Sequence, residues 1–314
     1  MNEPHMTDQY TALRRELETL TTEAFRPELA EIDRRSTLEI ARIMNGEDIT
    51  VPSAVAEQLP SIAAAIDGIA ARMGRGGRLV YAGAGTAGRL GVLDASECPP
   101  TFNTTPGREV VGLIAGGPEA MVTSVEGAED SRDLAAADLA GLALTEADSV
   151  VGISASGRTP YALGAVEFAR RAGALTVGLA CNAGSPLAAA ADHGIEVVVG
   201  PELVVGSTRL KAGTAQKLVL NMLSTITMIR LGKTYGNLMV DVRASNEKLR
   251  ARSRRIVALA TGAADTAIEE ALSATDGEVK PAILTLLAKV DAATAGRLLA
   301  ASDGHLRVAL DAAT

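Results

Sequence analysis

The sequence predicts an α/β protein in which helices cover both faces of a five-stranded parallel sheet. Helices precede this sheet, and a small helical domain follows it. Five short segments rich in Val, Ile and Leu have the character of strands that are buried on both faces. Helical patterns lie between most of them, and this alternation is typical of a parallel sheet with helices on both sides. Together these observations predict a three-layer αβα sandwich.

The first 75 residues have a helical pattern. Ser36 and Glu39 fit a capping box at the start of an amphipathic stretch. Pro52 lies near the start of the next expected helix, and Pro60 is expected to kink or divide it. We expect an N-terminal helical segment over residues 1–59.

The sheet domain is expected over residues 60–235. A helix is predicted at 160–172, because Pro160 suits the first helical position. A long helix is predicted from about 208 to 231. The expected strands are 78–82, 110–114, 149–153, 175–179 and 196–199. In sheets of this kind, ligands bind at the carboxyl ends of the strands.

The last part of the chain has no strand pattern. After Ser245 it is rich in alanine and in charged residues, with Gly262, Gly277 and Gly304 at the expected turns. We therefore expect a small helical domain over residues 245–314.

Composition argues against several classes of partner. The chain has 314 residues, of which 47% are hydrophobic, so one sizeable domain and a smaller one can each have a core. It has no Trp and only 2% aromatic residues, which disfavours nucleic-acid recognition by base stacking. Its net charge of −8 disfavours nucleic acid and anionic membranes. We expect neither nucleic acid nor a membrane as a partner.

Metal binding and export are also not expected. Cys98 and Cys181 have no metal-ligand spacing, and none of the three histidines has a Cys or His nearby at ligand spacing. The polar start of the sequence has no signal-peptide pattern, and no window approaches the roughly 18 apolar residues of a membrane span. We expect a cytoplasmic protein without a metal site.

A glycine-rich turn follows the first expected strand. Residues 83–88 read GAGTAG, and backbone N–H groups at such a turn form a natural anion site. A dinucleotide site would also need an acidic residue about 20 positions later, which the sequence does not supply, so NAD is disfavoured. The residues alone leave a phosphate cradle and an ordinary tight turn equally open. The candidate binding residues here are Gly85, Thr86, Gly88 and Arg89.

The loop after the third expected strand reads SASGRTP, from residue 154 to residue 160. It offers hydroxyls, an arginine and free N–H groups at a helix start, and phosphate favours all three. N-capping explains one hydroxyl but not three together with an arginine. We therefore favour an anion site with Ser154, Ser156, Gly157, Arg158 and Thr159 as candidate residues.

A third segment, residues 206–214, again places hydroxyls and cations at a helix start. Its candidate residues are Ser207, Thr208 and Lys211. By itself, the segment is better explained as a capped helix with a solvated basic turn. Three such segments in one sheet domain, however, favour anion binding.

Two glutamates are candidate catalytic residues. Glu97 follows a helical stretch and precedes two prolines. A carboxylate near the C-terminal end of a helix is electrostatically unfavourable, which suits a general acid, but an ordinary solvated glutamate fits equally well. Glu129 lies between two helical stretches, and its residues alone favour a solvated acidic turn.

Seven segments together resemble the N-acetylmuramic acid 6-phosphate etherases, a family of the sugar-isomerase (SIS) superfamily. The resemblance runs in order through most of the chain and is weakest at its two ends. DASECPP and GSTRLKAGTAQKLVLNML are highly specific, whereas GAGT and SGRT alone indicate only the superfamily. One departure is Ala87, where the family commonly has Ser. The segments are STLEIARIMNGED (36–48), VYAGAGTAGRLGVLDASECPPTF (80–102), VGLIAGGPEA (111–120), VEGAEDSR (125–132), VGISASGRTPY (151–161), GSTRLKAGTAQKLVLNMLST (206–225) and GKTYGNLMVDV (232–242).

The resemblance implies an SIS-type fold and a carbon–oxygen lyase of cell-wall amino-sugar recycling. Such an enzyme cleaves the lactyl ether of its phosphosugar substrate by elimination and then water addition, without a cofactor. By motif position, Glu97 is the proton donor toward the lactate oxygen and Glu129 is the base at C2. The residues alone leave these two roles interchangeable. The resemblance also implies a homodimer with sites near the subunit interface.

Two other functions fit parts of the sequence. An SIS-fold aldose–ketose isomerase also needs a base at C2, but it needs no acid aimed at C3. A regulator that binds sugar phosphates, similar to the glucokinase regulatory protein, would bind without turnover. The presence of both glutamates in their full motifs favours the etherase, and product identity separates the three.

Overall fold

The computed structural model describes residues 11, 14, 15, 17–242 and 247–313. The chain divides into two compact units. The first contains the residues up to Asp94 together with Val111–Leu223, and the second contains Ala95–Val110 together with the residues from Ser224 onward. The expected division into 1–59, 60–235 and 245–314 stays a prediction, and its first and last segments both include residues outside the described ones.

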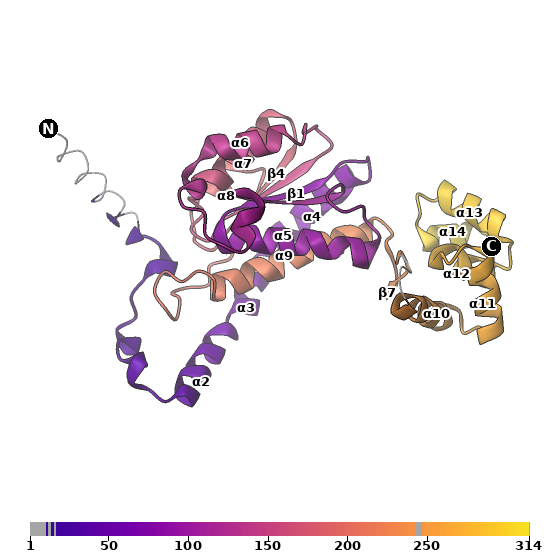
Figure 1. Cartoon of the computed structure of the whole chain (residues 1–314), viewed down its shortest axis with the longest axis horizontal. Helices are drawn as coiled ribbons and strands as arrows, with labels where there is room; N and C mark the ends of the chain where they lie inside the picture. Colours follow the sequence, from indigo (N-terminus) through magenta and orange to yellow (C-terminus); the bar gives the residue numbers. More distant parts are fainter. Residues whose placement is uncertain (1–10, 12–13, 16, 243–246, 314) are drawn as a thin grey trace. The chain divides into compact units, whose positions relative to one another are not determined.

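A five-stranded sheet forms the centre of the first unit (Figure 1). Its strand order is β2-β1-β3-β4-β5, and the pairs β1–β3, β3–β4 and β4–β5 are parallel. Gly83 pairs with Ile153, so β1 and β3 end at the same edge of the sheet. The strands are β1 (Leu79–Gly83), β2 (Val110–Ile114), β3 (Ser149–Ile153), β4 (Leu175–Ala180) and β5 (His193–Glu196).

The fifth strand lies earlier in the chain than predicted. The expected range 196–199 is wrong, because β5 covers His193–Glu196. β5 is an edge strand in which only Ile195 is buried, so its residues do not show the apolar pattern of a central strand. The more apolar residues that follow add one backbone bond to the sheet, from Val197 N–H to the Ala180 carbonyl at 2.9 Å.

Helices cover both faces of the sheet, as predicted (Figure 1). Successive strand residues face opposite layers. Gly152 lies against Val166 of one layer, whereas Ile153 lies against Gly91 of the other. One layer contains α6 (Arg132–Ala140), α7 (Pro160–Arg171) and α8 (Pro186–Ala190), and the other contains α4 (Leu59–Met73) and the first parts of α5 (Gly85–Phe102) and α9 (Lys211–Arg230).

The N-terminal helices begin as the sequence predicts. The Ser36 hydroxyl accepts a hydrogen bond from Glu39 N–H, and the Glu39 carboxylate accepts one from Ser36 N–H at 2.9 Å, which completes the capping box. Pro52 and Pro60 lie in the first turns of α3 and α4. The elements before α4 are the 3-10 helices Thr21–Glu23 (η1), Pro27–Leu29 (η2) and Ile32–Arg34 (η3), then α2 (Thr37–Asp48) and α3 (Val51–Ala56).

The buried side of α4 carries Ile62, Ile66 and Ile69, each at most 2% exposed. Within the described part of the chain, no single helix is both long and apolar enough to span a membrane. Thr37–Ala56 and α4 together have the length and apolar composition of a membrane span, but the two are bent by 61° relative to each other.

Helix α5 is longer than predicted. The sequence predicts that it ends at Ser96, before the prolines, but it continues to Phe102 with Pro99 and Pro100 inside it. A proline inside a helix lacks the N–H donor and its ring crowds the carbonyl four residues earlier, although its φ suits a helix. Helical hydrogen bonding is present again after the two prolines, with Asn103 N–H bonding to the Pro99 carbonyl at 3.0 Å. Glu97 is therefore a residue of the helix.

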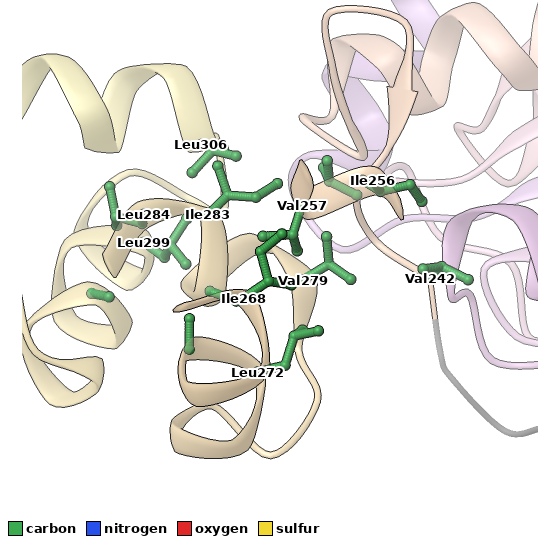
Figure 2. Packing of buried hydrophobic residues seen from close by; sticks show 14 of the residues in the cluster. Val242, Ile256, Val257, Ile268, Leu272, Val279, Ile283, Leu284, Leu299 and Leu306 are labelled. Atoms are coloured by element: carbon green, nitrogen blue, oxygen red, sulfur yellow. The ribbon is translucent and has the colours of Figure 1, made fainter. Parts of the chain in front are cut away.

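The second unit has its own hydrophobic core. Figure 2 shows Val257, Ile268 and Ile283 among the buried side chains that hold its helices together. Its turns include Gly262, Gly277 and Gly304, all with positive φ, as predicted. Its helices are α10 (Glu247–Thr261), α11 (Asp265–Ala274), α12 (Val279–Ala288), α13 (Ala292–Ala301) and α14 (Leu306–Ala313), and a hairpin of β6 (Thr234–Tyr235) and β7 (Leu238–Met239) was not predicted.

A buried ion pair fixes the amino ends of two central strands. Asp148, which is 2% exposed, precedes β3, and Arg78 precedes β1. The Asp148 carboxylate accepts hydrogen bonds from Arg78 N–H and Nε, both at 2.9 Å, and from Thr145 N–H at 2.8 Å. Burial alone would raise the pKa of Asp148, but the bonds from Arg78 and Thr145 outweigh it and hold the pKa below its usual value.

Replacing this carboxylate should destabilise the first unit. We expect Asp148→Asn to lower the free energy of unfolding by about 2–4 kcal/mol, because Arg78 loses its partner charge. The folded-state pKa is depressed, so the difference should be complete above the unfolded-state pKa of about 3.9 and should vanish as the pH falls through the folded-state pKa. Urea titrations of both proteins between neutral and acidic pH measure this.

The matched control is Glu31→Gln, because Glu31 pairs with Arg34 on the surface at 3.1 Å with both side chains at least 74% exposed. It should leave the unfolding midpoint unchanged. An Asp148→Asn protein as stable as the wild type at neutral pH would contradict the role given to the pair.

Candidate functional site

The carboxyl ends of β1 and β3 border a cavity of about 560 Å³. The loops after both strands line it, as do parts of the N-terminal segment, the Glu129 turn and the start of α9. This is the edge at which ligands of parallel α/β sheets bind. All of its lining residues belong to the first unit.

The turn after β1 brings α5 into close contact with the sheet. A Cβ on Gly88 would lie 2.6 Å from the Gly83 carbonyl oxygen and 2.7 Å from Ile114. Gly85, with φ of +53°, and Thr86 line the cavity, but Gly88 does not. Gly88 therefore serves the packing of helix on strand, which places the N-terminus of α5 at the cavity.

The two residues on either side of Gly88, Ala87 and Arg89, line different cavities. Ala87, at the position where the resemblance leads us to expect Ser, lines the cavity. Arg89 lines a smaller adjoining pocket instead. Its guanidinium donates to the carbonyls of Met121 at 3.2 Å and Thr123 at 3.3 Å, which ties it to the segment that leads to Glu129.

The loop after β3 holds its hydroxyls in one network. Ser154, which is 1% exposed, lies at the centre, with its Oγ 2.8 Å from Thr159 Oγ1 and 3.2 Å from Ser156 Oγ. Ser154 Oγ also accepts from Gly157 N–H at 3.0 Å, and Ser156 Oγ accepts from Arg158 N–H at 3.1 Å. Every one of these residues except Gly157 lines the cavity.

The N-terminus of α7 has no side-chain cap. Thr159 is its N-cap residue, but the Thr159 hydroxyl bonds to Ser154 and not to a backbone N–H of the helix. The alternative explanation for this loop, N-capping by Ser156 or Thr159, is therefore wrong, since Ser156 Oγ accepts from Arg158 N–H before the helix begins. An uncapped helix N-terminus beside several hydroxyls favours an anion.

Only part of the third predicted segment reaches the cavity. Thr208 lines it, whereas Ser207 and Lys211 do not. Lys211 is 4% exposed, and its ammonium pairs with Glu47 at 2.7 Å, which in turn pairs with Arg26 at 2.6 Å. Burial alone would raise the pKa of Glu47, but Lys211 and Arg26 hold it below its usual value.

The two predicted catalytic glutamates lie in different units. Glu129 is exposed in a 3-10 turn, Ala128–Asp130 (η5), and lines the cavity together with Asp130. Glu97 is exposed on α5, belongs to the second unit and does not line this cavity. Across the described residues, no cluster of three or more His, Cys, Asp or Glu side chains could hold a metal ion.

The N-terminal contribution to the cavity was not predicted from the sequence. Leu20, Thr22 and Glu23 line it. Asn182 fastens this segment, because its side chain accepts from Thr21 N–H at 2.8 Å and donates to Thr22 Oγ1 at 3.1 Å. It also donates to the Ala155 carbonyl of the hydroxyl loop at 3.0 Å. No local pattern in the sequence predicts these contacts, since the partners are about 160 residues apart.

Gln216 was also missed. It is 1% exposed, it lines the cavity, and its Nε2 has no hydrogen-bond partner. A signal existed in the sequence: Gln216 falls at helical spacing in the buried stripe that includes Ala212 and Val219. A polar residue in such a stripe marks either a buried network or a binding site.

The close contact at Gly88 can be tested by adding one methyl group. We expect Gly88→Ala to lower the free energy of unfolding by about 2 kcal/mol or more, because the Cβ would overlap backbone atoms of β1. Gly46→Ala is the control, since Gly46 lies inside α2 with nothing within 4 Å of a Cβ. That change should stabilise by about 0.5–1 kcal/mol. Chemical denaturation measures both, and a neutral Gly88→Ala would contradict the packing role.

Two family models agree with the resemblance to SIS proteins. The family model of the glucokinase regulatory protein N-terminal SIS domain matches residues 61–170, and that of the SIS domain matches residues 131–226. Among solved structures, a phosphoheptose isomerase from Francisella tularensis is 20% identical with a TM-score of 0.45, over 62% of this chain and 100% of that one.

Curated relatives match nearly the whole chain. An N-acetylmuramic acid 6-phosphate etherase of Streptomyces avermitilis is 81% identical, over 97% of both chains. Those of Streptomyces coelicolor and Rubrobacter xylanophilus are 80% and 61% identical, over 99% and 93% of this chain and 98% and 96% of theirs. At this identity and coverage, the chain belongs to the N-acetylmuramic acid 6-phosphate etherase family.

Proposed function

We propose that this protein cleaves the D-lactyl ether of N-acetylmuramic acid 6-phosphate to give N-acetylglucosamine 6-phosphate and D-lactate. Family membership supports the choice of substrate. One structural observation carries the proposal: the hydroxyl network after β3 and the Glu129 carboxylate line the same cavity. An anion site and a base are what a proton abstraction from a phosphosugar needs.

In this proposal, the phosphate binds where two helices begin. Ser154, Ser156 and Thr159 offer hydroxyls beside the uncapped start of α7, and Arg158 adds a positive charge. Gly85 and Thr86 contribute backbone and hydroxyl groups at the start of α5, and Thr208 another hydroxyl near α9. Gly88 and Gly157 serve indirectly, since they allow the close backbone packing of these turns.

The remaining predicted binding residues have other contacts. Lys211 is committed to Glu47 and Arg89 to two backbone carbonyls. We therefore propose that Lys211 and Arg89 support the shape of the site, whereas Ser207 stays a prediction from the sequence.

Glu129 is proposed as the base. In the open-chain sugar, the aldehyde at C1 acidifies the C2 proton, so a carboxylate can remove it. The C2–H electron pair then forms a C2–C3 double bond, and the C3–O bond breaks with its electrons moving to the lactyl oxygen. Water later adds its oxygen to C3 and a proton to C2, which gives the product without a net change in oxidation state.

Glu97 is proposed as the acid. Lactate leaves poorly from C3 unless its ether oxygen is protonated, and a second carboxyl group can supply that proton. The carboxyl of Glu97 is exposed on α5 of the single chain. We also propose that the protein is a homodimer. Its reaction would class it as a carbon–oxygen lyase that needs no cofactor. A cytoplasmic location in amino-sugar recycling is also part of this proposal, supported by two cysteines that form no disulfide.

The test is D-lactate release from N-acetylmuramic acid 6-phosphate. We expect turnover by the wild type and a fall of about 10²- to 10⁴-fold in kcat for Glu129→Gln and for Glu97→Gln, because each loses one proton-transfer group. Asp133→Asn is the control, since Asp133 is an exposed carboxylate at the start of α6 that does not line the cavity. It should keep full activity.

Two outcomes would contradict the proposal. Sugar phosphate bound by the wild type without any lactate would favour a regulator. Formation of a ketose phosphate in place of lactate would favour an isomerase.

A further inference from the structure

The buried amide of Gln216 is not explained by the packing of the protein. Gln216 is 1% exposed, and its Nε2 has no hydrogen-bond partner. An unsatisfied buried donor of this kind destabilises the folded protein. Buried polar groups in native proteins nearly always have partners, so an exception that borders a cavity points to a ligand.

The position of Gln216 connects it to the proposed substrate site. It lies on α9 one turn after Gly213, where an added Cβ would lie 3.5 Å from the methyl group of Thr86. Gln216 and Thr86 line one cavity with Glu129 and the hydroxyl network. An acceptor that enters this cavity can therefore take the amide hydrogen bond.

We propose that Gln216 donates to the carbonyl oxygen of the substrate's 2-acetamido group and so selects N-acetylated sugar phosphates. This inference rests on the proposed function. If Glu129 takes the C2 proton, the acetamido group on C2 lies in the cavity that Gln216 lines. The acetyl oxygen then needs a donor, because burying an unpaired carbonyl is costly.

The other acceptors of the substrate are better matched elsewhere. The phosphate and the lactyl carboxylate are anions, which favour charged donors such as Arg158 and helix N-termini over a single neutral amide. The sugar hydroxyls can donate as well as accept, so Glu129, Glu23 and the Ser and Thr hydroxyls serve them. The acetyl oxygen is neutral and can only accept, which matches the Gln216 donor; the aldehyde oxygen at C1 of the open-chain sugar has the same character, but glucose 6-phosphate carries it too, so the comparison below separates the two.

The experiment compares binding of two sugar phosphates by calorimetry. The probes are N-acetylglucosamine 6-phosphate and glucose 6-phosphate, which differ in the group on C2. Gln216→Met keeps the length of the side chain and removes its hydrogen bonds. We expect this substitution to lower the affinity for N-acetylglucosamine 6-phosphate about 10- to 100-fold. The affinity for glucose 6-phosphate should change less than about twofold.

Two controls separate binding from folding. Lys217→Met changes the adjacent, exposed residue of α9 and should alter neither affinity. The melting temperature of the unliganded Gln216→Met protein should match or exceed that of the wild type, since Nε2 has no partner to lose. A lower melting temperature would assign Gln216 a structural role.

The remaining outcomes are also decisive. If the affinity for both sugar phosphates fell equally, or if neither affinity fell, the acetamido assignment would be overturned while the proposed function stayed intact. A wild type that binds neither sugar phosphate would overturn the proposed function itself, and this inference with it.

Discussion

The close approach of α5 to β1 is the constraint on which the site depends. Gly88 N–H bonds to the Ala84 carbonyl at 3.2 Å, and a side chain on Gly88 would overlap the Gly83 carbonyl oxygen. The helix can therefore begin directly at the end of the strand. Since β1 and β3 are parallel and in register, their following loops open at one edge of the sheet. The N-termini of α5 and α7 consequently border a single cavity.

Around that edge, polar side chains form hydrogen bonds with one another. The hydroxyls of Ser154, Ser156 and Thr159 form a network whose geometry is set before any ligand binds. Asn182 joins this loop to the N-terminal segment, so residues about 160 positions apart shape one wall. Preorganisation of this kind lowers the entropy that binding must overcome. Gln216 differs, because its buried Nε2 has no hydrogen-bond partner.

Much of the fold could be predicted because its signals are local. The capping box at Ser36, the proline starts of α3 and α7 and the helix break near Pro60 are chemical features of single turns. The errors arose where tertiary context outweighs local preference. β5 is an edge strand with little apolar pattern, and α5 continues through Pro99 because hydrogen bonding resumes after it. Likewise, most of the loop candidates after β1 and β3 line the cavity, whereas Gly88, Arg89 and Gly157 do not. The partner of Lys211, Glu47, could be found only in three dimensions.

The central claim is that the cavity at the ends of β1 and β3 holds the phosphosugar. A crystal structure with N-acetylglucosamine 6-phosphate bound tests it most directly. We expect the phosphate within hydrogen-bond distance of the Ser154, Ser156 or Thr159 hydroxyls, with C2 beside the Glu129 carboxylate. A phosphate bound elsewhere on the protein, or C2 turned away from Glu129, would contradict it.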